Sequence, residues 1–206
     1  KPLTLTGATT GGGNSSPPAA KAASCTASTV LDASGGSTGI DVTSSNVTIT
    51  DLCVKDAQNH NIYTKATISD LTLDGVEALD AGNSTNPGYG LEVHNNAAVT
   101  TLNVTGSTFS DNGVGMRIRG TVDGLTIEGS AFDQNNYGFY TTLGGNVNDE
   151  LQDGGSTNVS DVTITNTTFN DNPNKGIYAE KLDDATFENI EVINSGTDAS
   201  ASFSPQ

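Results

Sequence analysis

A short strand-like pattern recurs six times along the chain and constrains its fold more than any other feature. Each copy has eight residues, and its first, third and eighth residues are apolar in all six copies, while the residues between them are mostly polar or Gly. Alternation of this kind predicts short strands with one buried face. Its recurrence predicts coils that stack on one another. The copies begin at Val47, Leu71, Leu102, Leu125, Val162 and Ala185.

The spacing of the copies sets the length of one coil. The starting numbers 47, 71, 102, 125, 162 and 185 differ by 24, 31, 23, 37 and 23. The recurring step of 23 or 24 is one coil, and the two longer steps are coils that carry loops, near residues 80–88 and 143–158. The turn at the fifth position divides each copy into two short strands, and a second recurring pattern, the second marker, indicates another strand, so we expect three short strands per coil. The second marker is a Gly or Asn followed by an apolar residue, at Gly39-Ile40, Asn61-Ile62, Gly90-Leu91, Gly115-Met116, Gly138-Phe139 and Gly176-Ile177.

Two segments, LNVTGSTFSDNGVGM and LTIEGSAFDQNNYGF, carry the pattern of strand, turn, Phe, Asx-rich corner and Gly with an apolar residue. On these residues the chain resembles the right-handed parallel β-helix family, the pectate-lyase-like solenoids, over residues 25–196. The resemblance implies an all-β fold, a single right-handed parallel β-helix of about six to seven coils. Such coils cannot bury their apolar residues alone, but stacked about 4.8 Å apart they share one core. We expect two ladders of like side chains, Phe109–Phe132–Phe169 and Asn112–Asn135–Asn172.

The ends of the chain differ from the repeat. Residues 1–24 are predicted to be an N-terminal extension or cap, residues 25–196 the β-helix domain, and residues 197–206 a C-terminal tail. Within the extension, Lys1–Leu5 alternates like a strand. Ser16 and Pro17 can begin a short capping helix, and a Pro/Ala-rich linker is the alternative. Because each end of a solenoid exposes a sheet edge, the extension is expected to cover such an edge on its own solenoid or on a neighbour.

Composition narrows the set of partners. The chain has 24 acidic and 8 basic residues and a formal net charge of −16, which argues against a basic nucleic-acid-binding surface. No run approaches the roughly 20 apolar residues of a membrane span. The expected partners are cations, neutral polymers or other proteins. The chain starts at Lys1 without an apolar leader, and we expect a processed product located outside the cell or on its surface.

Two features fit that location. Cys25 and Cys53 are 28 positions apart, about one coil, which predicts a disulfide between adjacent coils; two unpaired thiols are the alternative. Six Asn-X-Ser/Thr sequons would permit glycosylation of a surface protein, and chance occurrence in a chain rich in Asn, Ser and Thr is the alternative. They stand at Asn14, Asn46, Asn83, Asn103, Asn158 and Asn166.

The best candidate binding face follows from alternation. If the apolar residues of the second marker point inward, the residues after them point outward on one sheet, which the two loops border. This face gathers both arginines and several aromatic rings. The candidate ligand-binding residues are Tyr63, Lys65, Glu92, His94, Arg117, Arg119, Tyr140 and Tyr178.

The resemblance also implies an enzymatic alternative. Enzymes of this fold cleave or epimerise acidic polysaccharides by removing the proton beside a uronate. Arg117 or Arg119 would then hold the uronate carboxylate, and His94 or Tyr140 would move the proton. Glu92 would orient His94. A surface ladder of ion pairs between Glu92 and the arginines is the competing interpretation.

One further set of acidic residues falls in a single corner column of the repeat. It could share calcium between coils, or its side chains could simply cap the turns. Apart from this calcium, no cofactor is expected. The column comprises Asp56, Asp80, Asp111 and Asp171.

These observations favour a secreted or cell-surface structural or adhesive module. It would self-associate, as the subunit of an extracellular filament whose N-terminal segment docks on a neighbour, or bind a cell-surface or polysaccharide partner. The alternative is a polysaccharide lyase or epimerase acting on uronate polymers. The catalytic evidence is negative on balance, so the sequence leans away from an enzyme without deciding the question.

Overall fold

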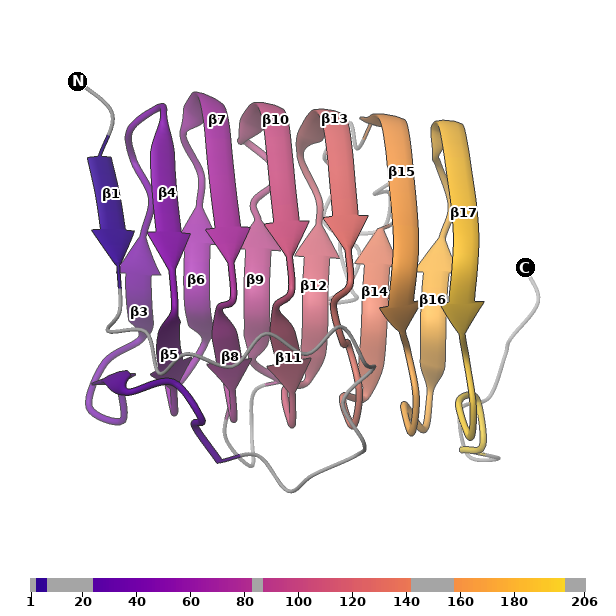
Figure 1. Ribbon diagram of the computed structural model, residues 1–206, viewed down its shortest axis with the longest axis horizontal. Helices are drawn as coiled ribbons and strands as arrows, with labels where there is room; N and C mark the ends of the chain where they lie inside the picture. The colour runs from indigo at the N-terminus through magenta and orange to yellow at the C-terminus, as the bar shows by residue number, and fades with distance from the viewer. Residues whose placement is uncertain (1–2, 7–23, 83–86, 142–157, 199–206) are drawn as a thin grey trace.

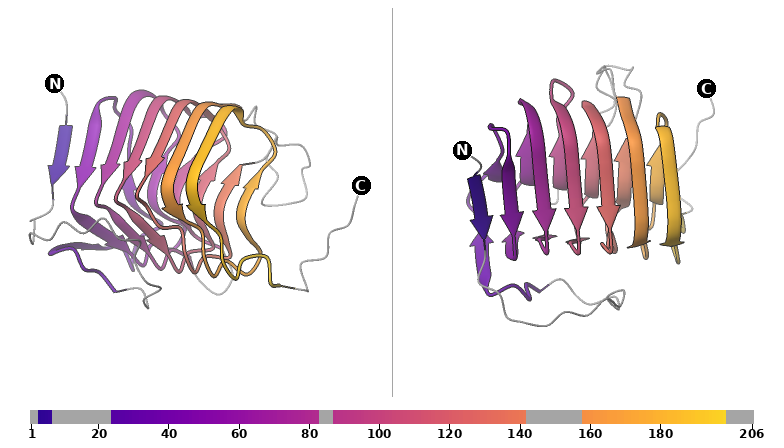
Figure 2. Two further views of the ribbon diagram at one scale, coloured as in Figure 1. Left: turned by 45° about the vertical axis from the view of Figure 1, so that its right-hand side comes forward. Right: turned by 45° about the horizontal axis from the view of Figure 1, so that its top comes forward.

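The protein is a stack of parallel β-strands wound around one core. A computed structural model describes residues 3–6, 24–82, 87–141 and 158–198, and these contain seventeen strands and no helix. The strands form three parallel sheets, with the N-terminal strand at one end of the stack and the last strand at the other (Figures 1 and 2). The predicted all-β parallel β-helix is confirmed.

From β2 (Thr29–Asp32) to β13 (Thr121–Glu128) the chain contributes one strand to each of three sheets in turn, and beyond β13 it alternates between the two larger sheets. The largest sheet holds β1 (Leu3–Thr6), β4 (Val47–Thr50), β7 (Thr67–Asp74), β10 (Ala98–Thr105), β13 (Thr121–Glu128), β15 (Asn158–Thr168) and β17 (Asp183–Glu191). The second sheet holds β3 (Thr38–Asp41), β6 (His60–Thr64), β9 (Tyr89–Val93), β12 (Val114–Ile118), β14 (Tyr137–Thr141) and β16 (Lys175–Ala179). The short third sheet holds β2 (Thr29–Asp32), β5 (Leu52–Lys55), β8 (Glu77–Leu79) and β11 (Thr108–Ser110).

The turn expected at the fifth position of each copy is a single residue in the left-handed region. Only Gly, Asn and Asp adopt this conformation readily, and only these types occur there. The six turn residues are Asp51, Gly75, Gly106, Gly129, Asn166 and Asn189, with φ between 49° and 63°. The left-handed residue at this position therefore turns the chain from the largest sheet toward the third sheet.

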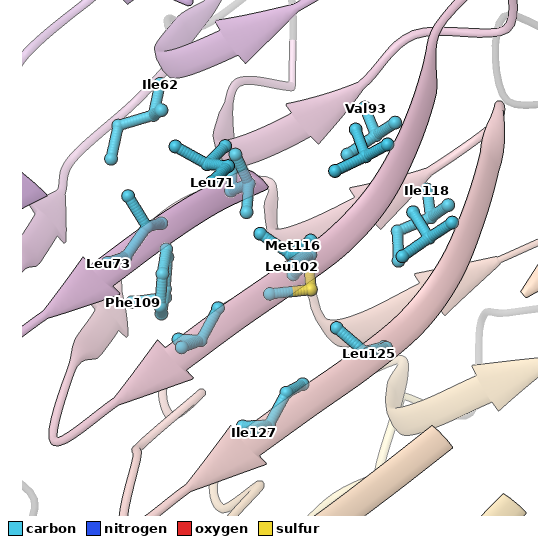
Figure 3. Close-up of a cluster of buried hydrophobic side chains, with 14 of the residues drawn as sticks. Ile62, Leu71, Leu73, Val93, Leu102, Phe109, Met116, Ile118, Leu125 and Ile127 are labelled. Atoms are coloured by element: carbon cyan, nitrogen blue, oxygen red, sulfur yellow. The ribbon is translucent and has the colours of Figure 1, made fainter. Parts of the chain in front are cut away.

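The core consists of the apolar columns of the repeat. In Figure 3, Leu71, Leu102 and Leu125 from the largest sheet face Met116 and other residues of the second sheet. The first and third columns are buried from β4 to β15. On the last strand, β17, the same columns are exposed, because no further coil follows it in the described part of the chain.

Like side chains stack along the interior as expected. The rings of Phe109 and Phe132 lie 4.7 Å apart at 1° to one another, and those of Phe132 and Phe169 lie 5.3 Å apart at 11°. All three side chains are fully buried. Stacking of this kind adds to the transfer of each ring from water.

The asparagine ladder is also present and carries hydrogen bonds from coil to coil. Asn135 Oδ1 accepts from Asn112 N at 3.0 Å and from Asn112 Nδ2 at 3.1 Å, and Asn172 Oδ1 accepts from Asn135 N at 2.9 Å. The ladder extends further than predicted, because Asn61 Nδ2 donates to Leu79 O at 2.7 Å and lies 3.4 Å from Asn112 Oδ1. The ladder thus satisfies buried backbone groups at the corner, which would otherwise be costly.

Gly115 shows why a glycine follows most corners of the solenoid. A Cβ atom there would lie 2.7 Å from Gly138 O and 3.0 Å from Asn135 Nδ2. A side chain at Gly115 would therefore collide with the next strand and with the asparagine ladder.

The N-terminal extension contributes a strand to the solenoid. β1 pairs with β4 in parallel, Leu3 being the partner of Val47, so the strand-like alternation at the start of the chain is real. The body of the solenoid then begins with a strap over the third sheet. A disulfide joins Cys25 to Cys53, and Glu77 accepts hydrogen bonds from Thr26 N at 2.7 Å and from the Thr26 hydroxyl. The predicted capping helix at residues 16–23 lies outside the described residues.

Candidate functional site

The candidate face is the outer surface of the second sheet, and its register matches the alternation predicted from sequence. Consecutive Cα partners run along it from coil to coil. The file is Asp41, Tyr63, Glu92, Arg117, Tyr140 and Tyr178.

Glu92 forms the centre of this face. Its side chain is fully buried although it belongs to the outward file. Arg119 donates to Glu92 Oε1 through Nε at 2.7 Å and Nη2 at 2.5 Å, and Arg117 Nη1 lies 3.8 Å from the same oxygen. His60 Nε2 lies 2.5 Å from Glu92 Oε2. Buried carboxylates need partners of this kind, because an unpaired charge there is very costly.

These contacts control the ionisation of Glu92. Burial by itself raises the pKa of the carboxyl group, but the hydrogen bond from His60 and the charge of Arg119 outweigh it. The pKa of Glu92 therefore lies below its usual value. The group remains a carboxylate at neutral pH, bound to its cationic neighbours.

Arg117 is held by an aromatic ring as well. Its Nη1 donates to the Tyr89 hydroxyl at 2.6 Å, and its guanidinium carbon lies 4.9 Å from the centre of the Tyr89 ring. The side chain is 1% exposed. Both arginines are thus nearly buried, and both lie close to Glu92.

Aromatic rings continue the face toward both ends of the solenoid. His60 packs on Tyr63 at 4.4 Å and on Tyr89 at 5.4 Å between ring centres. Toward the C-terminal end, Tyr140 stacks on Tyr178 at 5.2 Å. The Tyr178 hydroxyl donates to Glu180, and this bond, with burial, raises the pKa of Tyr178 to about 12.

Sequence reasoning brought together most of this face but missed three of its members. His60, Tyr89 and Tyr137 belong to a second column that opens the strands of the sheet, in register with one another through Val114. Each stands immediately before the Gly or Asn of the second marker. An aromatic residue immediately before the second marker was therefore the sequence signal that could have identified these three residues.

The contacts also revise the roles that the enzymatic alternative gave to the two histidines. The partner of Glu92 Oε2 is His60, whereas the ring of His94 lies 5.8 Å from that of Tyr63 and its Nδ1 accepts from Asn96 N. Glu92 forms the ion pairs with the arginines that the competing interpretation expected. Lys65 is exposed at the edge of the face. Of the loops expected to wall the face, residues 80–88 and 143–158, the stretches 83–86 and 143–157 lie outside the described residues.

The corner aspartates form a column of turn residues. Asp56, Asp80, Asp111 and Asp171 all have positive φ, between 55° and 61°. Burial, then the charges of Asp111 and Asp56, raise the pKa of Asp80. Within the described part of the chain, one group of His, Cys, Asp and Glu brings three ligand atoms within 4.8 Å, and it consists of Glu77 and the two disulfide sulfurs. Calcium at the corner column stays a prediction.

The sequons lie at several positions on the solenoid. Asn46 and Asn166 are exposed, whereas Asn103 and Asn158 are half-buried on strands. Asn14 and Asn83 lie outside the described residues. Glycosylation at any of the six stays a prediction.

The two ends of the solenoid form a second candidate site. All the large hydrophobic side chains that are exposed in the described residues lie on the first and last coils. At the N-terminal end they include Leu3, 60% exposed, and at the C-terminal end Phe187 and Val192, 42% and 50% exposed. The full set is Leu3, Leu5, Val30, Leu31, Phe187, Val192 and Ile193.

A comparison with protein families agrees with this architecture. A family model described as a right-handed beta helix region matches residues 23–132, more than half of the chain. The chain belongs to the right-handed β-helix family. No match to this β-helix was found among curated proteins or among solved structures. The described residues hold no helix with the length and apolarity needed to cross a membrane.

Proposed function

We propose that this β-helix is a structural subunit that stacks end to end into an extracellular filament, with β1 at each junction. One observation carries the proposal: within the described residues, the large apolar side chains that are exposed all lie on the two terminal coils, while those of the coils between them are buried or partly buried. Apolar surface that is gathered in one place, rather than scattered, is typical of an interaction site. The occupant that fits each end best is the opposite end of a second copy.

The register of the sheets supports this fit. Leu3 and Leu5 belong to the same inward columns as Ala185 and Phe187, because the pairing runs without a shift through every strand of the largest sheet. If β17 of one copy pairs with β1 of the next, Leu5 therefore packs on Phe187. The sheet then continues across the junction with its parallel hydrogen bonds complete.

The third sheet gives a second match. Leu31 is the partner of Val54, which occupies the eighth column of the repeat, and Val192 occupies the same column on the last coil. Stacking would bury both side chains together. The apolar residues of the largest sheet and of the third sheet thus come together in the same end-to-end alignment of two copies.

Charges on the largest sheet are compatible with the junction. Acidic residues alternate with threonines along one outward file, as in Asp74, Thr105 and Glu128. In the proposed register Glu188 of one copy comes opposite Thr6 of the next, so no two carboxylates face each other there. The net charge of −16 still opposes assembly, and we expect salt to promote it by screening.

The location and the competing function follow from other contacts. The Cys25–Cys53 disulfide supports an oxidising, extracellular setting. The lyase or epimerase alternative gains no such support, because the arginines meant for a uronate already pair with Glu92.

The proposal is tested by a cross-link between copies. A Thr4→Cys variant is mixed with a Thr186→Cys variant and oxidised, since residues opposite one another in neighbouring strands lie about 4.8 Å apart, within disulfide range. We expect a covalent heterodimer that becomes more abundant with protein concentration and salt. A Thr4→Cys and Thr126→Cys mixture is the matched control, because Thr126 lies in the same file near the middle of the solenoid. Equal yields in the two mixtures, or no heterodimer in either, would rule out end-to-end stacking.

A further inference from the structure

β1 is joined to its coil in a different way from the other first strands. In each of the six repeat copies, one left-handed residue connects the strand of the largest sheet to the next segment, as Asp51 does between Thr50 and Leu52. Between Thr6 and Thr29, by contrast, residues 7–28 separate β1 from the next strand that the structure describes. β1 is therefore not joined to its coil by the one-residue turn found in the six repeat copies.

The place of β1 is a strand-shaped slot on the edge of β4. The sequence of β1, Leu-Thr-Leu-Thr, follows the same pattern as the Val-Thr-Ile-Thr of β4, and the two strands pair in register. Leu3 N also donates to Asn46 O at 3.1 Å. Among the described strands, β1 has β4 as its single neighbour in the sheet. Leu3 and Leu5 stay well exposed, so the strand is held by one ladder and by partly buried side chains.

The strap fixes where the tether of β1 begins. The disulfide at Cys25 and the hydrogen bonds to Glu77 attach the chain to the third sheet. Residues 7–24 are left between β1 and this anchor. At 3.3–3.6 Å per residue, 18 residues span at most about 65 Å.

This reach exceeds the distance to the same slot on an adjacent copy. The largest sheet has seven strands, so equivalent slots in an end-to-end stack are about 34 Å apart at 4.8 Å per strand. β1 paired with β4 of the adjacent copy would make the same contacts as β1 paired with β4 of its own copy. Binding of β1 to its own copy is favoured by the effective concentration of a covalently linked segment, which is in the millimolar range. In a stack, the β4 edge of the adjacent copy is available to β1 at a local concentration comparable to that of its own β4 edge.

From the tether, the slot and the reach, we propose that β1 exchanges between copies, each copy lending its N-terminal strand to the β4 edge of a neighbour. The partner is a second copy of this chain. The exchange rests on the proposed filament, and it adds a covalent tether across junctions that otherwise hold only by stacking. It is a form of strand swapping.

The test separates exchange from stacking. A Thr4→Cys variant is mixed with an isotope-labelled Thr48→Cys variant under conditions in which the Thr4→Cys and Thr186→Cys pair forms heterodimers. Thr4 and Thr48 are Cα partners within one copy. A heterodimer in this mixture therefore requires β1 of one copy to sit on β4 of another. Mass spectrometry of the oxidised mixture identifies it by the label.

We expect a heterodimer at a yield at least several-fold above that of a Thr4→Cys and Thr72→Cys control, because Thr72 lies one strand further from the slot. An excess of a free peptide with the sequence of residues 1–6 should lower the yield. Heterodimers with Thr186→Cys but none with Thr48→Cys would overturn the exchange and leave stacking intact. Equal yields with Thr48→Cys and Thr72→Cys would overturn it as well. Failure with Thr186→Cys would instead count against the filament itself.

Discussion

Replacing Phe187 by Ala should weaken end-to-end association by a predictable amount. Phe187 is 42% exposed on the last strand, and a Phe side chain offers on the order of 200 Å² for burial. Stacking would then bury about 85 Å², which at 25 cal/mol per Å² stabilises each junction by about 2 kcal/mol. That free energy corresponds to a roughly 30-fold change in the association constant of a junction.

The assay is the critical concentration for assembly, measured by light scattering and sedimentation. We expect it to rise roughly 30-fold in Phe187→Ala, with strand content by circular dichroism unchanged. Leu31→Ala at the opposite end should shift it in the same direction, since Leu31 is exposed there too. Thr163→Ala, on an exposed side face of the solenoid, is the matched control. A critical concentration that stays the same in both end variants, while the fold is intact, would refute the reasoning.

Three further predictions concern the solenoid body. Asn135→Leu removes the hydrogen-bond acceptor of the buried Asn112 N. Because a buried polar group without a partner costs about 1–3 kcal/mol, the melting temperature should fall. Asn136→Ala, at the exposed position next to Asn135, is the control and should leave the melting temperature unchanged. An unchanged melting temperature in Asn135→Leu would show that the ladder does not stabilise the fold. Cys53→Ser opens a disulfide between residues 28 apart, and loop entropy predicts a loss of about 3–4 kcal/mol in the free energy of unfolding by denaturant; a loss under about 1 kcal/mol would contradict it. Glu92 has a lowered pKa in the folded state, so its stabilising effect is present above its ordinary pKa of 4.5 and fades as the pH falls through the folded value. Glu92→Gln should therefore destabilise the protein at pH 7 and much less at pH 3, and an equal effect at both pH values would disprove the ion-pair role.

The fold could be predicted from the sequence because its signals are local and repeated. Leu102, Leu125 and their counterparts alternate with polar residues and recur at one coil length, and this pattern has few structural solutions. The ladders follow from it, since in-register stacking brings equal columns together. The prediction fell short at the first and last coils, where Phe187 occupies a core column but has no following coil in the described part of the chain to bury it.

The candidate face was harder to predict than the core. Period-two alternation identified the column that contains Glu92 and Arg117, because the backbone of a strand directs successive side chains to opposite faces of the sheet. It gave no sign that these charged side chains are buried, since burial depends on neighbours from other coils. His60 was missed as the partner of Glu92 for the same reason: the two residues belong to different coils, and only the stacking of coils brings them to 2.5 Å.

The most direct test of the central claim is electron cryo-microscopy of the native protein, concentrated in the presence of salt. The largest sheet contributes seven strands per copy. End-to-end stacking therefore predicts filaments with a strong layer line at about 4.8 Å and an axial rise of about 34 Å per subunit. Dispersed monomers at every concentration and salt level would contradict the account. So would filaments whose rise does not correspond to the seven-strand stack.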